Sequence, residues 1–192
     1  MIPTRQKIDA LWNTHNLPPL KRNHCMLVAR LAVWFAQRLM AEGSVKEINI
    51  PLLEAAALLH DIDKMVPKLP HEQHPDAGVR ILTAAGYPLI ADLVKTHPLH
   101  AILDQNIAPR SIEQKLLYLS DKMVKHEIIT VDQRFALWRS ENLPATARDV
   151  LDRSYPLVKA LETEVCGVLR VAPEDVAKLA NTTETSTMNV SH

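Results

Sequence analysis

Hydrophobic and polar positions recur at helical spacing along most of the chain, and no long segment alternates with the period of a β-strand. Prolines, glycines and capping residues divide this pattern into segments. Ser111 and Thr130 are each followed three positions later by glutamine, which marks two helix starts as capping boxes. We predict helices over residues 4–15, 20–41, 51–61 and 147–171, and further helices that begin at His74, Ser111, Thr130 and Pro173 or end at His97.

The composition also favours an all-α fold. Hydrophobic residues make up 47% of the 192 residues, aromatic residues make up only 4%, and there are four glycines. This combination is typical of a helical protein with a core of leucine, alanine and valine. The length suits one domain with a sizeable core. We predict a single helical domain over residues 1–180 and a polar, threonine-rich, disordered tail over 181–192.

The charge balance argues against two classes of partner. The net charge is zero, so nothing attracts the chain to a nucleic acid duplex or to an anionic membrane. No run approaches the roughly 18 apolar residues of a membrane-spanning helix, and the first residues resemble no secretory signal. Cys25 and Cys166 form no motif together. We therefore expect a cytoplasmic protein, and the sequence leaves a homodimer open.

The stretch from Ala55 to Lys64 carries the strongest chemical signal. Its alanines and leucines predict a helix without a polar face, buried in a bundle, and this run leads directly into His60 and Asp61. Burying an unpaired carboxylate would cost on the order of several kcal/mol. A metal ion would neutralise Asp61 and bind the neighbouring imidazole. The alternative is a helix end at which His60 caps carbonyl groups and Asp61 faces water.

Three further histidines and a second aspartate fall on predicted helix faces that are otherwise apolar. Asp121 shares its face with Leu117 and Val124, so its charge would be buried and uncompensated without a cation. Separate partners for so many buried polar groups are less plausible than one shared metal cluster. Mixed imidazole and carboxylate ligands suit Mn, Fe, Co, Ni or Zn rather than Ca. The predicted ligands are His24, His60, Asp61, His74, His97 and Asp121, on five predicted helices.

The order of these residues resembles the HD-domain superfamily of metal-dependent phosphohydrolases. That family has a histidine, a His-Asp dyad and a distal aspartate on a helical bundle, which here match His24, the dyad at His60, and Asp121. The resemblance covers residues 22–125 and leaves a C-terminal helical extension over 130–180. His-Asp-x-x-Lys and Ser-Asp-Lys are closest to the branch that hydrolyses dinucleoside polyphosphates symmetrically. Two features depart from these patterns: Asp63 stands where many members have glycine, and Pro98 stands where that branch has threonine.

The resemblance implies roles for individual residues. His24, His60, Asp61 and Asp121 would hold one divalent transition metal, and Asp61 would bridge to a second ion held by His74 and His97. A metal-bound hydroxide would attack phosphorus in a nucleotide or another phosphate ester or anhydride. Lys64 would neutralise charge that develops on the phosphate. His100 and Lys122 would contact the substrate, although a solvated surface position is also open for each.

Two other functions remain open at this stage. Some HD-domain members use the same ligands as a diiron oxygenase, and others could be non-enzymatic nucleotide-sensing modules. A complete set of six ligand types favours the hydrolase, because a sensing module has little need of it.

Overall fold

The computed structural model describes residues 1–182, with side chains through Ala180. These residues form nine α-helices, one short 3-10 helix (η1) and no β-strand, which confirms the predicted all-α fold. The elements are α1 (Arg5–Thr14), α2 (Pro19–Ala41), α3 (Ile50–Leu59), α4 (Asp76–Ala84), α5 (Pro88–Lys95), η1 (Leu99–Leu103), α6 (Ile112–Lys122), α7 (Val131–Ser140), α8 (Ala145–Leu169) and α9 (Pro173–Thr182).

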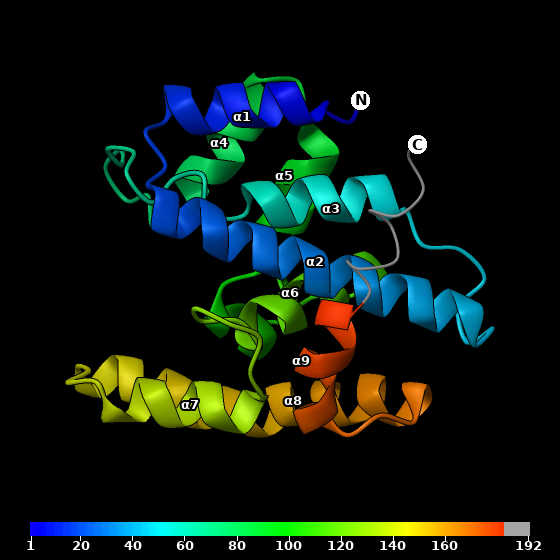
Figure 1. Ribbon diagram of the computed structural model, residues 1–192. Coiled ribbons are helices and arrows are strands. Elements are labelled where there is room, and N and C mark those ends of the chain that lie inside the picture. The colour runs from blue at the N-terminus through cyan, green and yellow to red at the C-terminus, as the bar shows by residue number, and fades with distance from the viewer. Residues whose placement is uncertain (183–192) are drawn as a thin grey trace.

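Four helices, α2, α3, α5 and α6, enclose the centre of the bundle (Figure 1). α3 packs against α2 on one side and α5 on the other, and α6 contacts all three. α1 lies on α3, and α4 lies on α5. α7 and α8 form a helical hairpin along the lower edge of the view, where α8 contacts α6 and η1 (Figure 1).

α3 is the buried helix that its composition predicts. Seven of its residues are buried, from Leu52 to Leu59 with the exception of Glu54. Carbonyl groups in the last turn of a helix have no partner within the helix. The indole Nε1 of Trp12 on α1 donates to the carbonyl of Leu58 over 2.9 Å and supplies one such partner. α1 therefore supports the end of α3 from which the His-Asp dyad projects.

The two helix starts marked by capping boxes agree with the sequence, whereas the helix limits predicted at His74 and His97 do not. Both capping boxes, at Ser111 and at Thr130, are formed. His74 lies in the loop before α4, and His97 follows α5, so the prediction that both histidines lie on helices is wrong.

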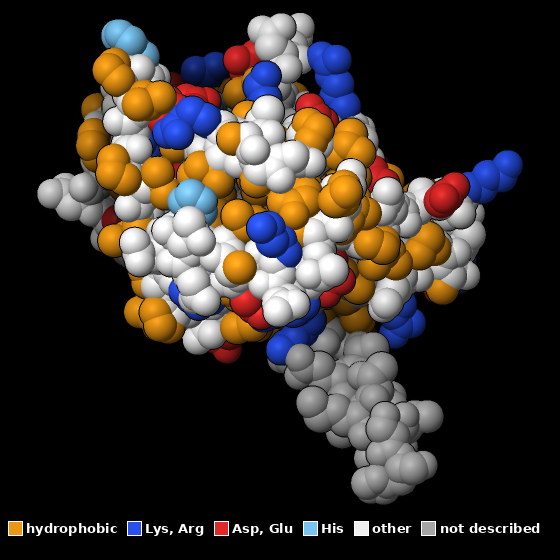
Figure 2. All heavy atoms as spheres, turned by 90° about the horizontal axis from the view of Figure 1, so that it is seen from above, with side chains coloured by type: hydrophobic (Ala, Val, Ile, Leu, Met, Phe, Trp, Pro, Cys, Tyr) orange, Lys and Arg blue, Asp and Glu red, His pale blue; other side chains and the backbone are white. Residues whose placement is uncertain are grey.

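The predicted disordered tail overlaps α9, which continues through Thr182, and the remainder of that tail lies outside the described residues. On the face of the molecule that carries α1, acidic and basic side chains are interspersed (Figure 2). Within residues 1–182, no helix combines the length and the apolar character needed to cross a membrane.

Candidate metal centre

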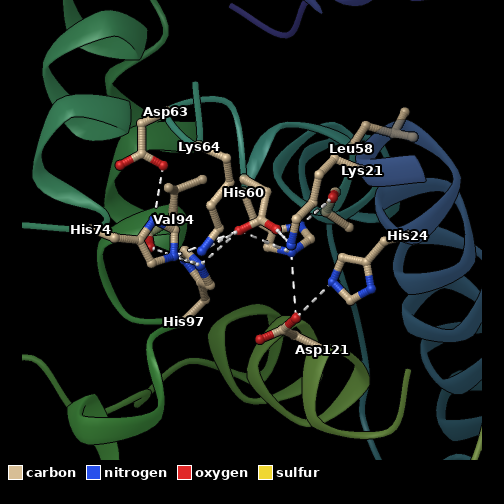
Figure 3. A network of polar contacts seen from close by, with 12 residues as sticks. Lys21, His24, Leu58, His60, Asp63, Lys64, His74, Val94, His97 and Asp121 are labelled. Carbon is tan, nitrogen blue, oxygen red and sulfur yellow. Dashed lines mark hydrogen bonds and ion pairs between the residues drawn. The ribbon is translucent and has the colours of Figure 1, made fainter. Parts of the chain in front are cut away.

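The six predicted ligands lie close together inside the bundle. Figure 3 shows five of them, His24, His60, His74, His97 and Asp121. His24 extends from α2, and Asp121 extends from the last turns of α6. His60 is the C-terminal cap of α3 and Asp61 follows it. The loops before α4 and after α5 contribute the remaining two, His74 and His97.

His60 and His97 are held by the same local bond. The Nδ1 of His60 lies 2.7 Å from the carbonyl of Ala57, and the Nδ1 of His97 lies 2.6 Å from the carbonyl of Val94. A carbonyl only accepts, so each Nδ1 carries a proton, and Nε2 is the ring nitrogen of each histidine that is left to bind a metal ion. Both rings cap a helix end and present Nε2 to the centre, as metal-bound imidazoles do.

The two sequence interpretations of the dyad are therefore both partly correct. His60 does cap a carbonyl group at a helix end. Asp61, however, is only 4% exposed and does not face water.

Asp63 orients His74. One of its carboxylate oxygens, Oδ1, lies 2.8 Å from Nδ1 of His74, and the Asp63 side chain is fully buried. A carboxylate that accepts from Nδ1–H fixes the ring orientation and makes Nε2 a stronger ligand. The aspartate that replaces the common glycine thus adds a carboxylate behind the site.

The nitrogens of His74 and His97 need a cation between them. Their Nε2 atoms are 2.9 Å apart. Because each ring uses Nδ1 as its donor, two lone pairs face each other, and only a proton or a metal ion relieves this contact. Two imidazole nitrogens bound to one metal at about 2.0–2.1 Å would be separated by about 2.9 Å if the two bonds were perpendicular. Nε2 of His60 likewise has no hydrogen-bond partner among the described residues, although it is buried.

Asp61 lies at the centre of these groups. Its Oδ1 is 3.6 Å from Nε2 of His74, 3.8 Å from that of His60 and 3.9 Å from that of His97. The ammonium of Lys64 is 3.2 Å from Oδ1, and that of Lys21 is 3.2 Å from Oδ2. Burial raises the pKa of Asp61, but His60 and Lys64 more than offset this effect and hold the pKa well below its usual range.

The carboxylate of Asp121 has a positively charged partner that the sequence analysis did not predict. Its Oδ1 is 3.0 Å from Nε2 of His24 and 3.4 Å from Nε2 of His60. Its Oδ2, however, is paired at 2.5 Å with the ammonium of the next residue, Lys122. The charge of Asp121 is therefore compensated without a metal, and the prediction that it is uncompensated is wrong. Since lysines neutralise both carboxylates, the case for a metal rests on the imidazole nitrogens: the unpartnered Nε2 of His60 and the close contact between Nε2 of His74 and Nε2 of His97.

The electrostatic field of the site favours a positive charge at its centre. Burial lowers the pKa of His60, but the neighbouring Cys25, Asp61 and Asp121 raise it well above its usual range. Burial, reinforced by His60 and His74, holds the pKa of His97 well below its usual range, so that ring is neutral and keeps its lone pair. A metal ion would supply the positive charge that the groups around His60 favour, and it would also bind the neutral imidazole of His97.

Two groups of side chains have ligand atoms close enough to share an ion, within 4.8 Å of one another. One group is His24, His60 and Asp121, and the other is His60, Asp61 and His97. The buried nitrogens and carboxylates thus fit one or two transition metal ions, with His60 common to both groups.

A cavity of about 770 Å³ opens onto the site. Basic side chains outnumber acidic ones in its lining, and the two central carboxylates face the candidate metal position. An anionic ligand would therefore meet a surplus of positive charge. The basic residues are Lys21, Lys64, Lys68, Lys122, Lys125 and Arg134, and the acidic ones are Asp61, Glu72 and Asp121.

The predicted substrate-contacting residues have different positions. Lys64 is partly exposed above Asp61, where its ammonium can reach an incoming anion. His100 is exposed on η1 and lines the cavity. Lys122 is only 2% exposed and donates to the carbonyl of His97 over 2.6 Å, so a solvated surface position is wrong for this residue. Its ammonium also forms an ion pair with the carboxylate of Asp121.

The sequence interpretation assigned no role at the site to several cavity residues, among them Lys21, Arg134 and Trp138. Lys21 lies one helical turn before His24, and this spacing was the only available signal. Arg134 and Trp138 lie on α7 and line the same cavity. No local pattern indicates their role, because α7 reaches the site only through the packing of distant segments.

Comparison with known proteins identifies one matching family. The HD-domain family model matches residues 22–125, more than half of the chain, and this segment contains all six predicted ligands. No curated protein and no solved structure matches the chain. α7, α8 and α9 lie beyond the matched segment.

Proposed function

Because the chain belongs to the HD-domain family, we propose that it is a metal-dependent phosphohydrolase that acts on a nucleotide or a related phosphate ester or anhydride. The observation that carries this proposal is the set of imidazole nitrogens that face one another at the floor of a cavity with surplus positive charge: Nε2 of His60 has no partner, and Nε2 of His74 and Nε2 of His97 are 2.9 Å apart. Metal-dependent hydrolases are the common activity of the family, and the proposal extends this to a phosphorylated small molecule.

The ligands proposed for the metal are His24, His60, Asp61, His74, His97 and Asp121. A bound divalent metal supplies charge that makes water a better nucleophile and stabilises the phosphoryl oxygens. Asp61 takes the central position, because it lies near three of the imidazole nitrogens. Lys64 neutralises charge on the phosphate from the open side of the cavity. Lys122 holds Asp121 in place.

The proposal is tested by phosphate release. Purified protein is stripped with chelator, reloaded separately with Mn, Fe, Co, Ni or Zn, and assayed with mononucleotides and dinucleoside polyphosphates. We expect release only after reloading, with near-stoichiometric metal by elemental analysis. Oxygen consumption is followed in parallel with reduced iron. Release that persists in chelator, or oxygen consumption without release, would contradict the proposal.

The finer substrate assignment is a symmetrically cleaved dinucleoside polyphosphate. Two features support it: the His-Asp-x-x-Lys and Ser-Asp-Lys sequences, and a cavity lined by several lysines that suits a chain of phosphates. Pro98 in place of the threonine of that branch is the feature that speaks against it. Preference for such a substrate over mononucleotides in the same assay decides the point.

Lys64→Ala should lower turnover and leave metal content unchanged. The lysine contacts Asp61 through one charge-assisted contact and is partly exposed, so it is not needed to hold the ion. Loss of one charge on the transition state corresponds to roughly 10- to 100-fold in kcat. Lys68→Ala, another lysine of the cavity wall, is the matched control, with a smaller effect expected. Loss of metal along with activity would show that the assigned role is wrong.

A further inference from the structure

Arg134 on α7 is a buried cation with unsatisfied hydrogen-bond donors. It is 8% exposed, and its Nε and Nη1 atoms have no hydrogen-bond partner among the described residues. Its guanidinium lies 4.1 Å from the ring centroid of Trp138, and both residues line the cavity of the candidate metal centre. Leaving such donors unsatisfied is costly, so a cavity lined by Arg134 suits an anionic ligand.

The chain holds Arg134 in this position through buried bonds. The backbone N–H of Val131 donates to the carboxylate of Glu162 on α8 over 2.8 Å, and Glu162 is fully buried. The ammonium of Lys159 donates to that same carboxylate over 2.6 Å. The first turn of α7 is thereby attached to α8, and Arg134 follows one turn later.

A second, apolar pocket begins where the charged cavity ends. Its volume is about 440 Å³, within the range of roughly 300–1,000 Å³ that is common for small-molecule sites. Leu143, Val150 and Leu151 supply its apolar wall, from the loop after α7 and from α8. Trp138 and His100 line both spaces, so the pocket lies next to the cavity.

We infer that α7 and α8 form a nucleoside-phosphate subsite, in which Arg134 binds a phosphate beside the scissile one and the apolar pocket next to Trp138 binds the nucleoside. The inference rests on the proposed function for the position of the scissile phosphate. An arginine fork matches phosphate oxygens, and a flat base gains contact energy against an aromatic ring and apolar walls. The order of surfaces, from candidate metal position to Arg134 to Trp138 to apolar wall, matches the order of groups in a nucleoside polyphosphate.

Equilibrium binding tests this subsite without requiring turnover. The probes are α,β-methylene-ADP and methylenebisphosphonate, which shares the two phosphorus groups but lacks the nucleoside. Both are titrated by calorimetry into the full chain, in chelator and in Mn²⁺. Wild type should bind the nucleoside probe about tenfold or more tightly than the bisphosphonate. Arg134→Met should weaken both probes by about 10- to 100-fold.

Two variants separate the pocket from the arginine. Trp138→Leu should weaken the nucleoside probe and leave the bisphosphonate unchanged. Ala147→Trp fills the pocket from a partly exposed position of α8 and should have the same selective effect without removing a core side chain.

Arg139→Met is the matched control. Arg139 is on the same helix and also lies over an aromatic ring, 4.8 Å from the centroid of Tyr155, but it is outside the cavity. If Arg134 served only the fold, Arg134→Met would lower Tm, whereas removal of an unpartnered guanidinium should leave Tm within a few degrees of wild type. Equal affinity for the two probes, or equal affinity of Arg134→Met and Arg139→Met, would overturn the inference. Absence of phosphate release with these binding differences intact would overturn the proposed function alone.

Discussion

Asp61→Asn should abolish metal-dependent phosphate release, with a loss on the order of 1000-fold or more. Asp61 has Oδ1 within 3.9 Å of three imidazole nitrogens and is the only carboxylate so placed among the described residues. An amide keeps the shape but carries no charge, so the affinity for a divalent ion should fall together with turnover. The measurements are metal content and initial rate at saturating substrate.

The folded state should survive this change. Lys21 and Lys64, the lysines paired with Asp61, have side chains that are 44% and 31% exposed, so water can solvate both ammonium groups. Asp9→Asn on α1 removes an exposed carboxylate far from the site and serves as control. Asp61→Asn with normal metal content and normal rate would show that the centre of the site has been misplaced.

Asp121→Asn should destabilise the metal-free protein by about 3–5 kcal/mol, equivalent to a fall of roughly 6–20 °C in Tm. The reason is Lys122, whose ammonium is buried and loses its carboxylate partner. From sequence alone the expected sign is the opposite, because Asp121 then has no partner to leave behind. Thermal unfolding in chelator therefore distinguishes the two arguments.

The double variant Asp121→Asn with Lys122→Met is the control. Replacing the lysine by an apolar chain of similar length removes the stranded charge and should recover most of the lost stability. Metal should stabilise wild type by about 2.7 kcal/mol at a concentration of 100 Kd, and should stabilise Asp121→Asn less. An unchanged Tm of Asp121→Asn in chelator would contradict the pairing of Asp121 with Lys122.

Local patterns were sufficient to predict most helices. The two capping boxes are formed at Ser111 and Thr130, and the alanine and leucine run before His60 is the buried helix α3. These features depend on neighbours three or four positions away, which the sequence displays directly. The same holds for the ligand types, because a histidine or aspartate on an apolar face is visible without knowing what packs against it.

The charge partners of Asp61 and Asp121 could not be predicted from local sequence patterns. Lys122 is adjacent to Asp121 in sequence, yet neighbours on a helix normally point in different directions. Lys122 is the last residue of α6, and its ammonium contacts both the carbonyl of His97 and the carboxylate of Asp121. Asp63 likewise gains its role from His74, eleven residues away across a loop.

The sequence by itself determined the helical class, the buried dyad and the kinds of ligand, because periodicity and residue type are local properties of the chain. The tertiary structure decided which imidazole nitrogens face one another, which lysines neutralise Asp61, and where α7 lies. These depend on contacts between distant segments: the bond from Val131 to Glu162 joins helices whose contact no local pattern encodes, and it directs Arg134 toward a cavity formed by residues far earlier in the chain.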